Sequence, residues 1–536
     1  YLTMKTNNIN RWLSSALLSS MVIAGGCSDN WDDHYSGQNS GKSDLTVMEI
    51  IKSNPNLSKF AKMIGIAGME DMLDTTQTYT VWAPSDEALS AIDLNDVEEV
   101  KRIVLNHIAR FNISSSTNPM KNVRMYNGKV NHFGAGTFAG VELAESDIIA
   151  RNGVLHLLRE AIPYRYNLRE YIDTHPECSL LSQFIARFDE EKFDEEASAP
   201  LDVDEAGNTI YDTVTVAYNR LFQHPVYGLG DIEAEDSVFT MLIPDNRAWE
   251  DAFKKTEPYF TVYNKDAAIA DSIREVQTSL ALLSDLIFRA EITDAASSAP
   301  QTTTSGSLIT DMAGMFSGSV KQQASNGLFY LTSNLNLDPV ATFNKRIDVE
   351  AEESTGRENG NNRTAAYTRV LGTDNPLFNE VSGHSYLEVQ GTTASAAPAI
   401  SFRLPGVLSG KYDIYATFLP ASVEDASLSN DSTRMQFTFN YPDPATGRNR
   451  STVFDDESFV TSGTRMTTIK VAEGFTFPVS DFVDRLWLMD PTNDKANRLS
   501  TISIDVETNV ERNEFNNGVL TRRFRIDCIY LIPVTD

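Results

Sequence analysis

The residue whose chemistry is easiest to specify is Cys27. Lys5 and Arg11 precede an apolar stretch over residues 12–24, which is short for a membrane span and runs into Ala-Gly-Gly-Cys. Small residues before a cysteine suit a lipoprotein signal peptidase, and the thiol of Cys27 would then receive the lipid. We therefore expect residues 1–26 to be a lipoprotein signal peptide and Cys27 to anchor the chain in a membrane. The alternative is a plain secretory signal with an incidental cysteine.

Other residue types that support chemistry form no recognisable constellation. The seven histidines are scattered, without an HExxH motif, so the sequence predicts no zinc site: they are His34, His107, His132, His156, His175, His224 and His384. The sequence also contains no GxSxG elbow, no P-loop and no GxGxxG. A glycan-cleaving enzyme needs two carboxylates at a defined separation, and 74 acidic residues do not exclude such a pair. Because no segment resembles a hydrolase, we predict that the chain is not an enzyme.

Composition indicates an exported chain of about three domains. The 536 residues are 41% hydrophobic, which is ample for several cores, and the formal net charge is −29. Nucleic acid and anionic lipid surfaces are poor partners for such a chain. We attribute the acid excess to a solvated surface in preference to a calcium or cationic-ligand role. Cys178 and Cys528 lie in different predicted domains, so we expect buried thiols and no disulfide framework.

Two segments of the chain repeat one pattern. Residues 79–89, Tyr-Thr-Val-Trp-Ala-Pro-Ser-Asp-Glu-Ala-Leu, recur at 239–249 as Phe-Thr-Met-Leu-Ile-Pro-Asp-Asn-Arg-Ala-Trp. An Asn-Gly pair inside an apolar run follows each copy, at Asn152-Gly153 and at Asn326-Gly327. Asn-Gly is the pair that most readily turns a tight hairpin. The economical interpretation is two copies of one domain.

The residues inside each copy have a structural explanation. Pro84 and Pro244 cannot donate to a continuing strand ladder, and Ser85 and Asp245 can each accept a bond from a free helix amide. We therefore expect a strand followed by a helix in both copies. Asp86 and Glu87 would fall in the first turn of that helix, where negative charge suits the helix dipole.

At these residues the chain resembles the fasciclin (FAS1) family. The resemblance rests on Ala-Pro-Ser-Asp-Glu-Ala at 83–88, Leu-Asn-His-Ile at 105–108 and Ala-Arg-Asn-Gly-Val-Leu-His at 150–156. His107 occupies the family's histidine position, although Asn106 replaces the preceding tyrosine. The resemblance implies a β-sandwich wedged with helices, used for adhesion or for binding glycans and matrix, without catalytic activity.

The resemblance sets two domain boundaries. The first repeat covers residues 44–166, and a looser second repeat covers 167–340 and lacks a histidine in 282–288. We expect His107 in an apolar helix and His156 in the second strand of the Asn-Gly hairpin, both as hydrogen-bonded structural residues.

The second repeat carries an insertion that the first lacks. An acidic run, 189–196, precedes residues 201–216, whose pattern predicts a hairpin turned at Gly207-Asn208. This arm is a candidate contact surface. A calcium loop starting at Asp202 is disfavoured, because Thr213 stands where a bidentate glutamate would be needed.

From residue 341 to 536 the pattern changes to short alternating runs that predict a β-sandwich. The expected strands are 346–352, 385–389, 399–404, 411–418, 434–439, 467–471, 499–506 and 524–532. The first of these strands, the Gly-Lys-Tyr-Asp-Ile-Tyr strand and the last strand resemble jelly-roll carbohydrate-binding modules. The overall fold class is thus α+β, with two fasciclin-like domains followed by an all-β jelly-roll-like sandwich.

The second resemblance nominates site residues. It implies that Glu350 and Glu352 help to hold a structural calcium, and we expect no other cofactor. Sugar binding needs exposed aromatic rings, and the candidates are Tyr412, Tyr415 and Trp487. We expect most of the aromatic rings to fill the core, because Tyr415 and Phe418 alternate with polar neighbours and so indicate an inner face.

Residues 27–43 form a polar tether after the signal peptide. Within it, Ser-Asp-Asn-Trp-Asp-Asp-His at 28–34 resembles the surface-export tag of Bacteroidetes lipoproteins, although these acids would also simply solvate a tether. We therefore expect a lipid-anchored protein on the extracellular side of the outer membrane, where it binds polysaccharide or partner proteins. The alternative is an accessory subunit of an outer-membrane TonB-dependent transporter complex that takes up glycan or another nutrient.

Overall fold

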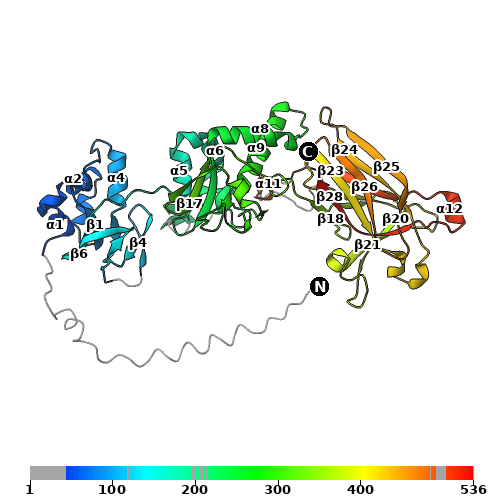
Figure 1. The fold of residues 1–536 in the computed structure, drawn as a ribbon, viewed down its shortest axis with the longest axis horizontal. Coiled ribbons are helices and arrows are strands. Elements are labelled where there is room, and N and C mark those ends of the chain that lie inside the picture. The colour runs from blue at the N-terminus through cyan, green and yellow to red at the C-terminus, as the bar shows by residue number, and fades with distance from the viewer. Residues whose placement is uncertain are drawn as a thin grey trace, which may run out of the picture. The chain divides into compact units, whose positions relative to one another are not determined.

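The computed structural model describes residues 44–116, 120–194, 199–203, 209–212, 214–482, 485–489 and 502–534. The predicted signal peptide, Cys27 and the tether lie outside these ranges. The chain divides into two compact units, residues 1–164 and 165–536 (Figure 1). No helix within the described ranges has the length and apolar character that a bilayer crossing requires.

The first unit contains a seven-stranded sheet in the order β2-β1-β7-β6-β5-β4-β3. Its strands are β1 (Tyr79–Pro84), β2 (Ile108–Arg110), β3 (Lys121–Arg124), β4 (Val130–Gly134), β5 (Thr137–Phe138), β6 (Val141–Ala150) and β7 (Gly153–Leu158). Its helices are α1 (Val47–Ser53), α2 (Ser58–Ile66), α3 (Glu70–Leu73) and α4 (Val97–Leu105). Thr46 begins α1 with a capping box, because its hydroxyl accepts from Glu49 N while the Glu49 carboxylate accepts from Thr46 N.

The second repeat reproduces the central pairing of the first. Strand β1 pairs in parallel with β7, so that Tyr79 lies opposite Gly153. Strand β12 (Phe239–Pro244) pairs in parallel with β17 (Gly327–Thr332), so that Phe239 lies opposite Gly327. Both glycines are required by this contact, because an added Cβ would lie 2.1 Å from the Tyr79 carbonyl oxygen or 1.9 Å from that of Phe239. The duplication predicted from the sequence is therefore a duplication of fold.

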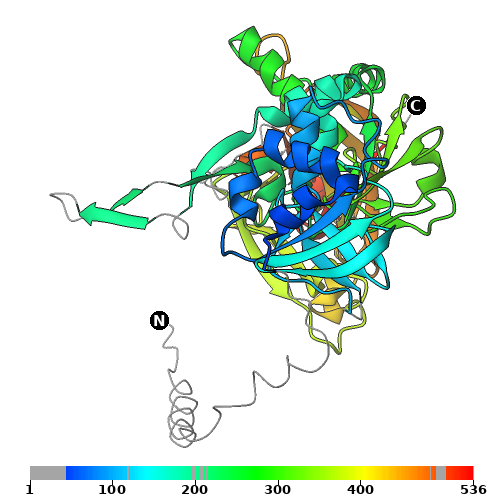
Figure 2. The same cartoon turned by 90° about the vertical axis from the view of Figure 1, so that its left-hand side faces the viewer.

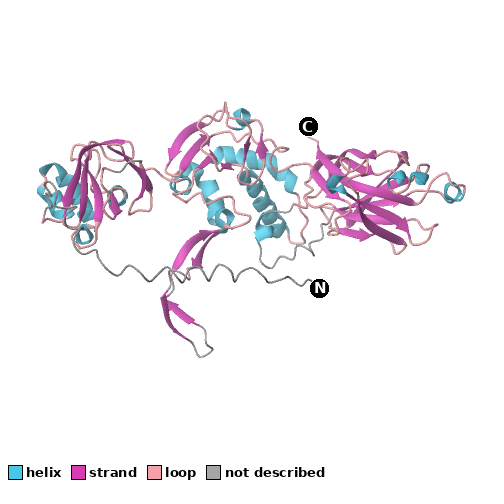
Figure 3. Ribbon diagram, turned by 90° about the horizontal axis from the view of Figure 1, so that it is seen from below, coloured by secondary structure: helices cyan, strands magenta, loops and turns pink. Residues whose placement is uncertain are grey.

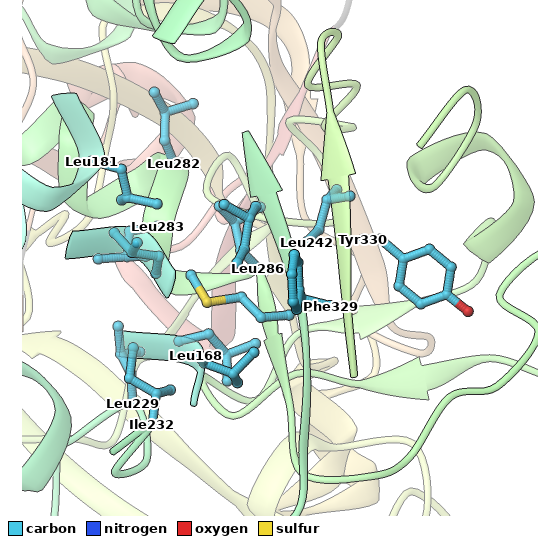
Figure 4. Packing of buried hydrophobic residues seen from close by; sticks show 14 of the residues in the cluster. Leu168, Leu181, Leu229, Ile232, Leu242, Leu282, Leu283, Leu286, Phe329 and Tyr330 are labelled. Carbon is cyan, nitrogen blue, oxygen red and sulfur yellow. The ribbon is translucent and has the colours of Figure 1, made fainter. Parts of the chain in front are cut away.

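Further elements complete the second repeat. Its sheet has the order β13-β12-β17-β16, with β13 (Ile287–Phe288) and β16 (Val320–Ala324), and β14 (Gln301–Thr302) pairs with β15 (Leu308–Ile309). The helices that cover its core include α5 (Leu168–Thr174), α6 (Ser179–Ala186), α7 (Arg220–Gln223), α8 (Asn246–Thr256), α9 (Ala267–Ser284) and α10 (Met312–Met315). Figure 4 shows Leu168, Leu181, Leu283 and Phe329 converging on this core.

The predicted helix after each proline forms in only one repeat. Asp245 caps α8 by accepting from Ala248 N at 2.8 Å. After Pro84 the chain makes turns instead, and Asp86 accepts from Lys59 N and Ser58 Oγ of α2. The role predicted for Asp86 at the start of its own helix is thus wrong, because that carboxylate caps a helix elsewhere in the chain.

The insertion of the second repeat is a hairpin arm in two segments. Strand β8 (Asp189–Phe193), which contains most of the acidic run, pairs with β11 (Thr215–Asn219). Strand β9 (Ala199–Val203) pairs with β10 (Thr209–Asp212), which confirms the predicted hairpin, whereas its turn lies outside the described residues. Figure 2 shows the arm extending away from the rest of its domain.

Residues beyond 341 form the predicted sandwich of two sheets (Figure 3). One sheet has the order β20-β21-β28-β23-β26, with β18 also paired to β28, and the other has the order β19-β22-β27-β24-β25. The strands are β18 (Ile347–Glu350), β19 (Arg357–Asn359), β20 (Thr364–Val370), β21 (Ser385–Gly391), β22 (Ala399–Arg403), β23 (Gly410–Phe418), β24 (Arg434–Pro442), β25 (Asn449–Val460), β26 (Thr467–Phe477), β27 (Ser503–Thr508) and β28 (Arg523–Pro533). All eight predicted strands are present, and β19, β20 and β25 were not predicted.

Candidate functional site

The predicted sugar-binding rings occupy three different environments. Tyr412 is 1% exposed, and its hydroxyl donates to Asn344 Oδ1 at 3.0 Å while accepting from Leu408 N. The prediction that Tyr412 binds a ligand is therefore wrong, because the ring is a core residue with a satisfied hydroxyl. The backbone of Trp487 lies in helix α11 (Arg485–Met489), and its side chain is outside the described residues.

Tyr415 is the predicted ring that reaches the surface. Alternate residues of β23, including Tyr412 and Phe418, are buried, whereas Tyr415 is half-buried on the opposite, outer face. The expectation that Tyr415 shares an inner face with Phe418 is wrong, because a separation of three residues places two side chains on opposite faces of a strand.

Tyr415 stacks on a second tyrosine that the sequence did not nominate. Tyr530 of β28 is its register partner, and the ring centroids lie 4.9 Å apart with planes 14° from parallel. Stacking of two aromatic rings contributes more free energy than the burial of their apolar area alone. The Cys-Ile-Tyr-Leu alternation of β28 was visible in the sequence, but the register with β23 that brings the rings together was not.

Two cations flank the stacked rings. The Arg346 guanidinium carbon lies 4.1 Å from the Tyr530 centroid, and Lys470 Nζ lies 5.9 Å from the Tyr415 centroid. We call Lys470, Tyr415, Tyr530 and Arg346 the tyrosine ladder. Figure 1 shows the strands that carry it, β26, β23, β28 and β18, on one side of the sandwich.

Carboxylates hold both cations of the ladder. Arg346 Nε donates to Asp348 at 2.7 Å, and Lys470 Nζ lies 3.0 Å from Asp413. A hydrogen bond from Gly474 N, together with Lys470, lowers the pKa of Asp413, so this ion pair persists at neutral pH.

The outer face of the sheet therefore carries two tyrosine hydroxyls, with two cationic donors and two carboxylate acceptors beside them.

The predicted calcium ligands lie beside a third acid. Ser382 links two of the carboxylates, since its hydroxyl donates to Glu350 Oε1 at 2.7 Å and its amide donates to Asp527 Oδ1 at 3.1 Å. Burial, reinforced by Glu350 and Glu352, raises the pKa of Asp527 to about 7. The Oε2 atoms of Glu350 and Glu352 are buried without a hydrogen-bond partner.

In the part of the chain that the structure describes, no group of three or more His, Cys, Asp or Glu residues is arranged to hold a metal ion. A calcium at Glu350 and Glu352 therefore stays a prediction. Asp527 was missed because its proximity depends on the pairing of β18 with β28.

His107 and His156 of the first repeat make structural hydrogen bonds. His107 is fully buried, with Nδ1 2.7 Å from Ile103 O and Nε2 accepting from Ile162 N, and burial lowers its pKa to about 4. His156 Nε2 lies 2.9 Å from Ile113 O. His107 stands in the turn between α4 and β2 rather than in the predicted helix. Cys178 is a free and buried thiol, as expected, whereas the free thiol of Cys528 is only half-buried.

Comparison with known proteins identifies the first repeat. Residues 55–163 match the family model of the fasciclin domain. Over 129 residues the chain is 26% identical to the transforming growth factor-beta-induced protein ig-h3 of Sus scrofa, covering 22% of this chain and 19% of that protein. The chain thus spans about a fifth of the length of that curated relative. The predicted fasciclin resemblance is confirmed for this repeat.

Comparison with solved structures found chains that resemble parts of this one. A FAS1 domain pair from the insect cell adhesion molecule Fasciclin I is 14% identical, covering 54% of this chain and 98% of its own, with a TM-score of 0.19. TmCBM61, solved with β-1,4-galactotriose, is 11% identical, covering 33% of this chain and 87% of its own, with a TM-score of 0.15. TmCBM27, a mannan-recognising carbohydrate-binding module, is 11% identical, covering 36% and 99%, with a TM-score of 0.17. At these identities and TM-scores we draw no functional conclusion from the likenesses.

Proposed function

We propose that this protein is a non-catalytic, surface-anchored binding protein whose sandwich contacts extracellular polysaccharide through the tyrosine ladder. The observation that carries the proposal is the stacked pair Tyr415 and Tyr530 on an outer sheet face, between Arg346 and Lys470. Aromatic rings with adjacent charged hydrogen-bonding groups are what a pyranose ring and its hydroxyls require.

Affinity electrophoresis in gels containing single polysaccharides tests this proposal with the full-length chain. Retention by one polysaccharide should weaken roughly fivefold for each ring removed by Tyr415→Ala or Tyr530→Ala, since an aromatic contact contributes about 1 kcal/mol. Tyr367→Ala is the matched control, because Tyr367 is 44% exposed on the same sandwich and lies outside the ladder. Equal retention of all four proteins, or no retention on any polysaccharide, would refute the proposal.

The membrane anchor is part of the same proposal. Cys27 follows an apolar stretch and small residues, and a polar tether separates it from the first repeat at residue 44. Radiolabelled palmitate should be incorporated by the wild type and not by Cys27→Ala, and protease added to intact cells should degrade the anchored chain. A transporter that co-purifies in stoichiometric amount would redirect the proposal to an uptake complex.

We further propose that Glu350 and Glu352 help to hold a structural calcium in the sandwich, next to Asp527. A bound calcium would give the two buried Oε2 atoms a partner, and its positive charge would lower the raised pKa of Asp527. Calcium at a hundredfold excess over its Kd should stabilise the fold by about 2.7 kcal/mol relative to EDTA. Glu350→Gln should abolish that gain in a thermal melt, whereas Glu353→Gln, at an exposed neighbour, should keep it.

A further inference from the structure

A cavity of about 490 Å³ lies in the second unit, where helix α11 packs on the second repeat. Leu486 of α11 packs against the core of that repeat, and Arg485 Nη1 donates to the Tyr227 carbonyl at 2.7 Å. Pockets of this size accommodate a small ligand. The cavity is separate from the tyrosine ladder, because none of the four ladder residues lines it.

A buried carboxylate faces this cavity. Asp285 is 3% exposed, and its Oδ1 accepts from Thr303 Oγ1 at 2.8 Å and from Ser305 Oγ. The contacts of the described residues include no ion pair to Asp285 and no hydrogen bond to its Oδ2. A buried charge is costly unless it is paired, so this oxygen is suited to accept a hydroxyl from a ligand.

Two cations line the same cavity. Burial lowers the pKa of Arg485, and attraction to Asp285 opposes that effect without a direct ion pair. Lys345 Nζ donates to Ser307 Oγ at 2.6 Å. Among the described residues that line the cavity, Asp285 is the one carboxylate beside Arg485 and Lys345, an excess of one positive charge in a chain whose formal net charge is −29. An arginine and a lysine converging on one space suit a carboxylate on the ligand.

The first repeat shows how the space arises. In both repeats a five-residue turn is closed by one backbone bond, from Met125 N to Lys129 O in the first and from Thr303 N to Ser307 O in the second. This equivalence sets Thr304, Ser305 and Ser307 at the positions of Tyr126, Asn127 and Lys129, respectively.

The second repeat thus has three short hydroxyl side chains where the first has a tyrosine, an asparagine and a lysine, all of which are larger. It also has Asp285 where the first has Asn106, whose amide oxygen accepts from Asn127 and Asn131. These substitutions between the repeats therefore provide both the space of the cavity and the polar groups that line it. Thr304 Oγ1 is buried without a hydrogen-bond partner.

We infer that this cavity binds a monosaccharide that bears one carboxylate, a hexuronic acid or the uronate end of an acidic polysaccharide. Arg485 and Lys345 receive the carboxylate, and Asp285 and Ser305 exchange hydrogen bonds with ring hydroxyls. Phe343 and Phe482 line the cavity and cover an apolar face of the sugar ring.

Calorimetric titration of the full-length chain with D-glucuronate and D-galacturonate tests the inference. D-glucose is the neutral match, and acetate is the match for the carboxylate. At least one uronate should bind about tenfold more tightly than glucose, because charge-assisted bonds are lost with the carboxylate. Failure of both uronates to bind, equal binding of glucose, or equal binding of acetate would each overturn it.

Variants locate the site. Arg485→Gln and Lys345→Gln should each weaken uronate binding about tenfold, whereas Arg247→Gln, whose side chain is 83% exposed, should not. Bound uronate should protect the peptides covering residues 226–228 and 303–307 from hydrogen exchange in the wild type. Protection elsewhere would overturn the inference even if Arg485→Gln were unstable. Tyr415→Ala should leave uronate binding intact, so failure here and failure of the polysaccharide proposal are distinguishable.

Discussion

The two repeats keep equivalent hydrogen bonds, with the same side chain at one position and a different side chain at another. Thr80 Oγ1 donates to Phe111 O and accepts from Ile113 N, and Thr240 Oγ1 does the same with Ala290 O and Ile292 N. His156 and Tyr330 occupy equivalent positions in the two repeats. His156 Nε2 lies 2.9 Å from the carbonyl oxygen of Ile113, and the Tyr330 hydroxyl donates to the carbonyl oxygen of Ile292 at 2.8 Å. The fold conserves the polar backbone group that must be satisfied, and chemically different residues satisfy it.

The repeats diverge further in the turn before β2, where the side chain bonds backbone groups in the first repeat only. His107 occupies the turn before β2 in the first repeat, and Leu286 occupies it in the second, as their bonds to Trp82 N and Leu242 N show. The adjacent position changes from Asn106 to Asp285 and opens onto the cavity of the second repeat. The change from Asn106 to Asp285 therefore gives the second repeat a buried carboxylate that the first repeat lacks.

The substitutions with the largest expected effect remove Asn152 and Asn326, the asparagines of the two equivalent Asn-Gly pairs. Asn152 accepts from Val47 N at 2.9 Å and donates to Leu73 O and Thr75 O, and Asn326 joins the equivalent elements of its own repeat. We expect Asn152→Ala to lower the free energy of unfolding of its repeat by about 4 kcal/mol, because three buried bonds are lost.

Asn326→Ala should cost about 3 kcal/mol, since one of its bonds, to Ala234 O, is 3.3 Å long. Hydrogen exchange of peptides from β7 and β17 during urea titration measures each repeat separately. Asn449→Ala, at an exposed position of β25, is the control with no expected effect. Losses below about 1 kcal/mol would show that these asparagines act only as turn residues.

The second test separates the repeats by pH. Burial holds the pKa of His107 at about 4, below the 6.5 of an exposed imidazole, so the folded state keeps it neutral while the unfolded state takes up a proton. The stability from this group is present above pH 6.5 and is lost as pH falls towards 4, by about 3 kcal/mol in total.

Leu286 carries no proton, so the second repeat lacks this contribution at the equivalent position. Urea unfolding of wild type and His107→Leu at pH 7 and pH 4.5 measures the difference between the two pH dependences. Identical pH dependence in both proteins would contradict the assignment.

The smallest test concerns the shared carbonyl contact. Tyr330→Phe removes the hydroxyl that donates to Ile292 O and leaves that buried carbonyl unsatisfied, so we expect a loss of about 1–2 kcal/mol. Tyr367→Phe, at an exposed ring, should change stability by less than about 0.5 kcal/mol. A similar result for both substitutions would mean that the second repeat does not depend on this bond.

Much of the fold was predictable from local patterns. Alternation predicted the eight strands of the sandwich, and the Asn-Gly pairs and prolines predicted the repeat, because these signals act within a few residues. Strand β25 escaped prediction because only one of its faces is covered and its charged stretch, Asp455–Glu457, interrupts the apolar pattern. The turns after Pro84 escaped because Asp86 bonds to α2, a tertiary partner that local propensity does not reveal.

The candidate sites were less predictable because they depend on register and on packing between distant segments. Tyr415 was named from its residue type, whereas Tyr530 joined it only through the pairing of β23 with β28. Tyr412 was misassigned for the converse reason, because composition does not tell which face of a strand meets the core. Asp285 and Arg485 are 200 positions apart and meet only in the folded chain.

The buried asparagines have a consequence for the chemical ageing of this chain. Asn-Gly is the dipeptide most prone to deamidation, because the glycine amide readily attacks the asparagine side chain to form a succinimide. In both repeats that side chain is anchored, with its oxygen accepting a backbone amide and its nitrogen donating to two carbonyls. The cyclisation would have to break all of these bonds, and the resulting aspartate would face two carbonyls with no proton to donate. The fold thereby protects two of the chain's five Asn-Gly units from deamidation, whereas the other three lie at 127–128, 359–360 and 517–518.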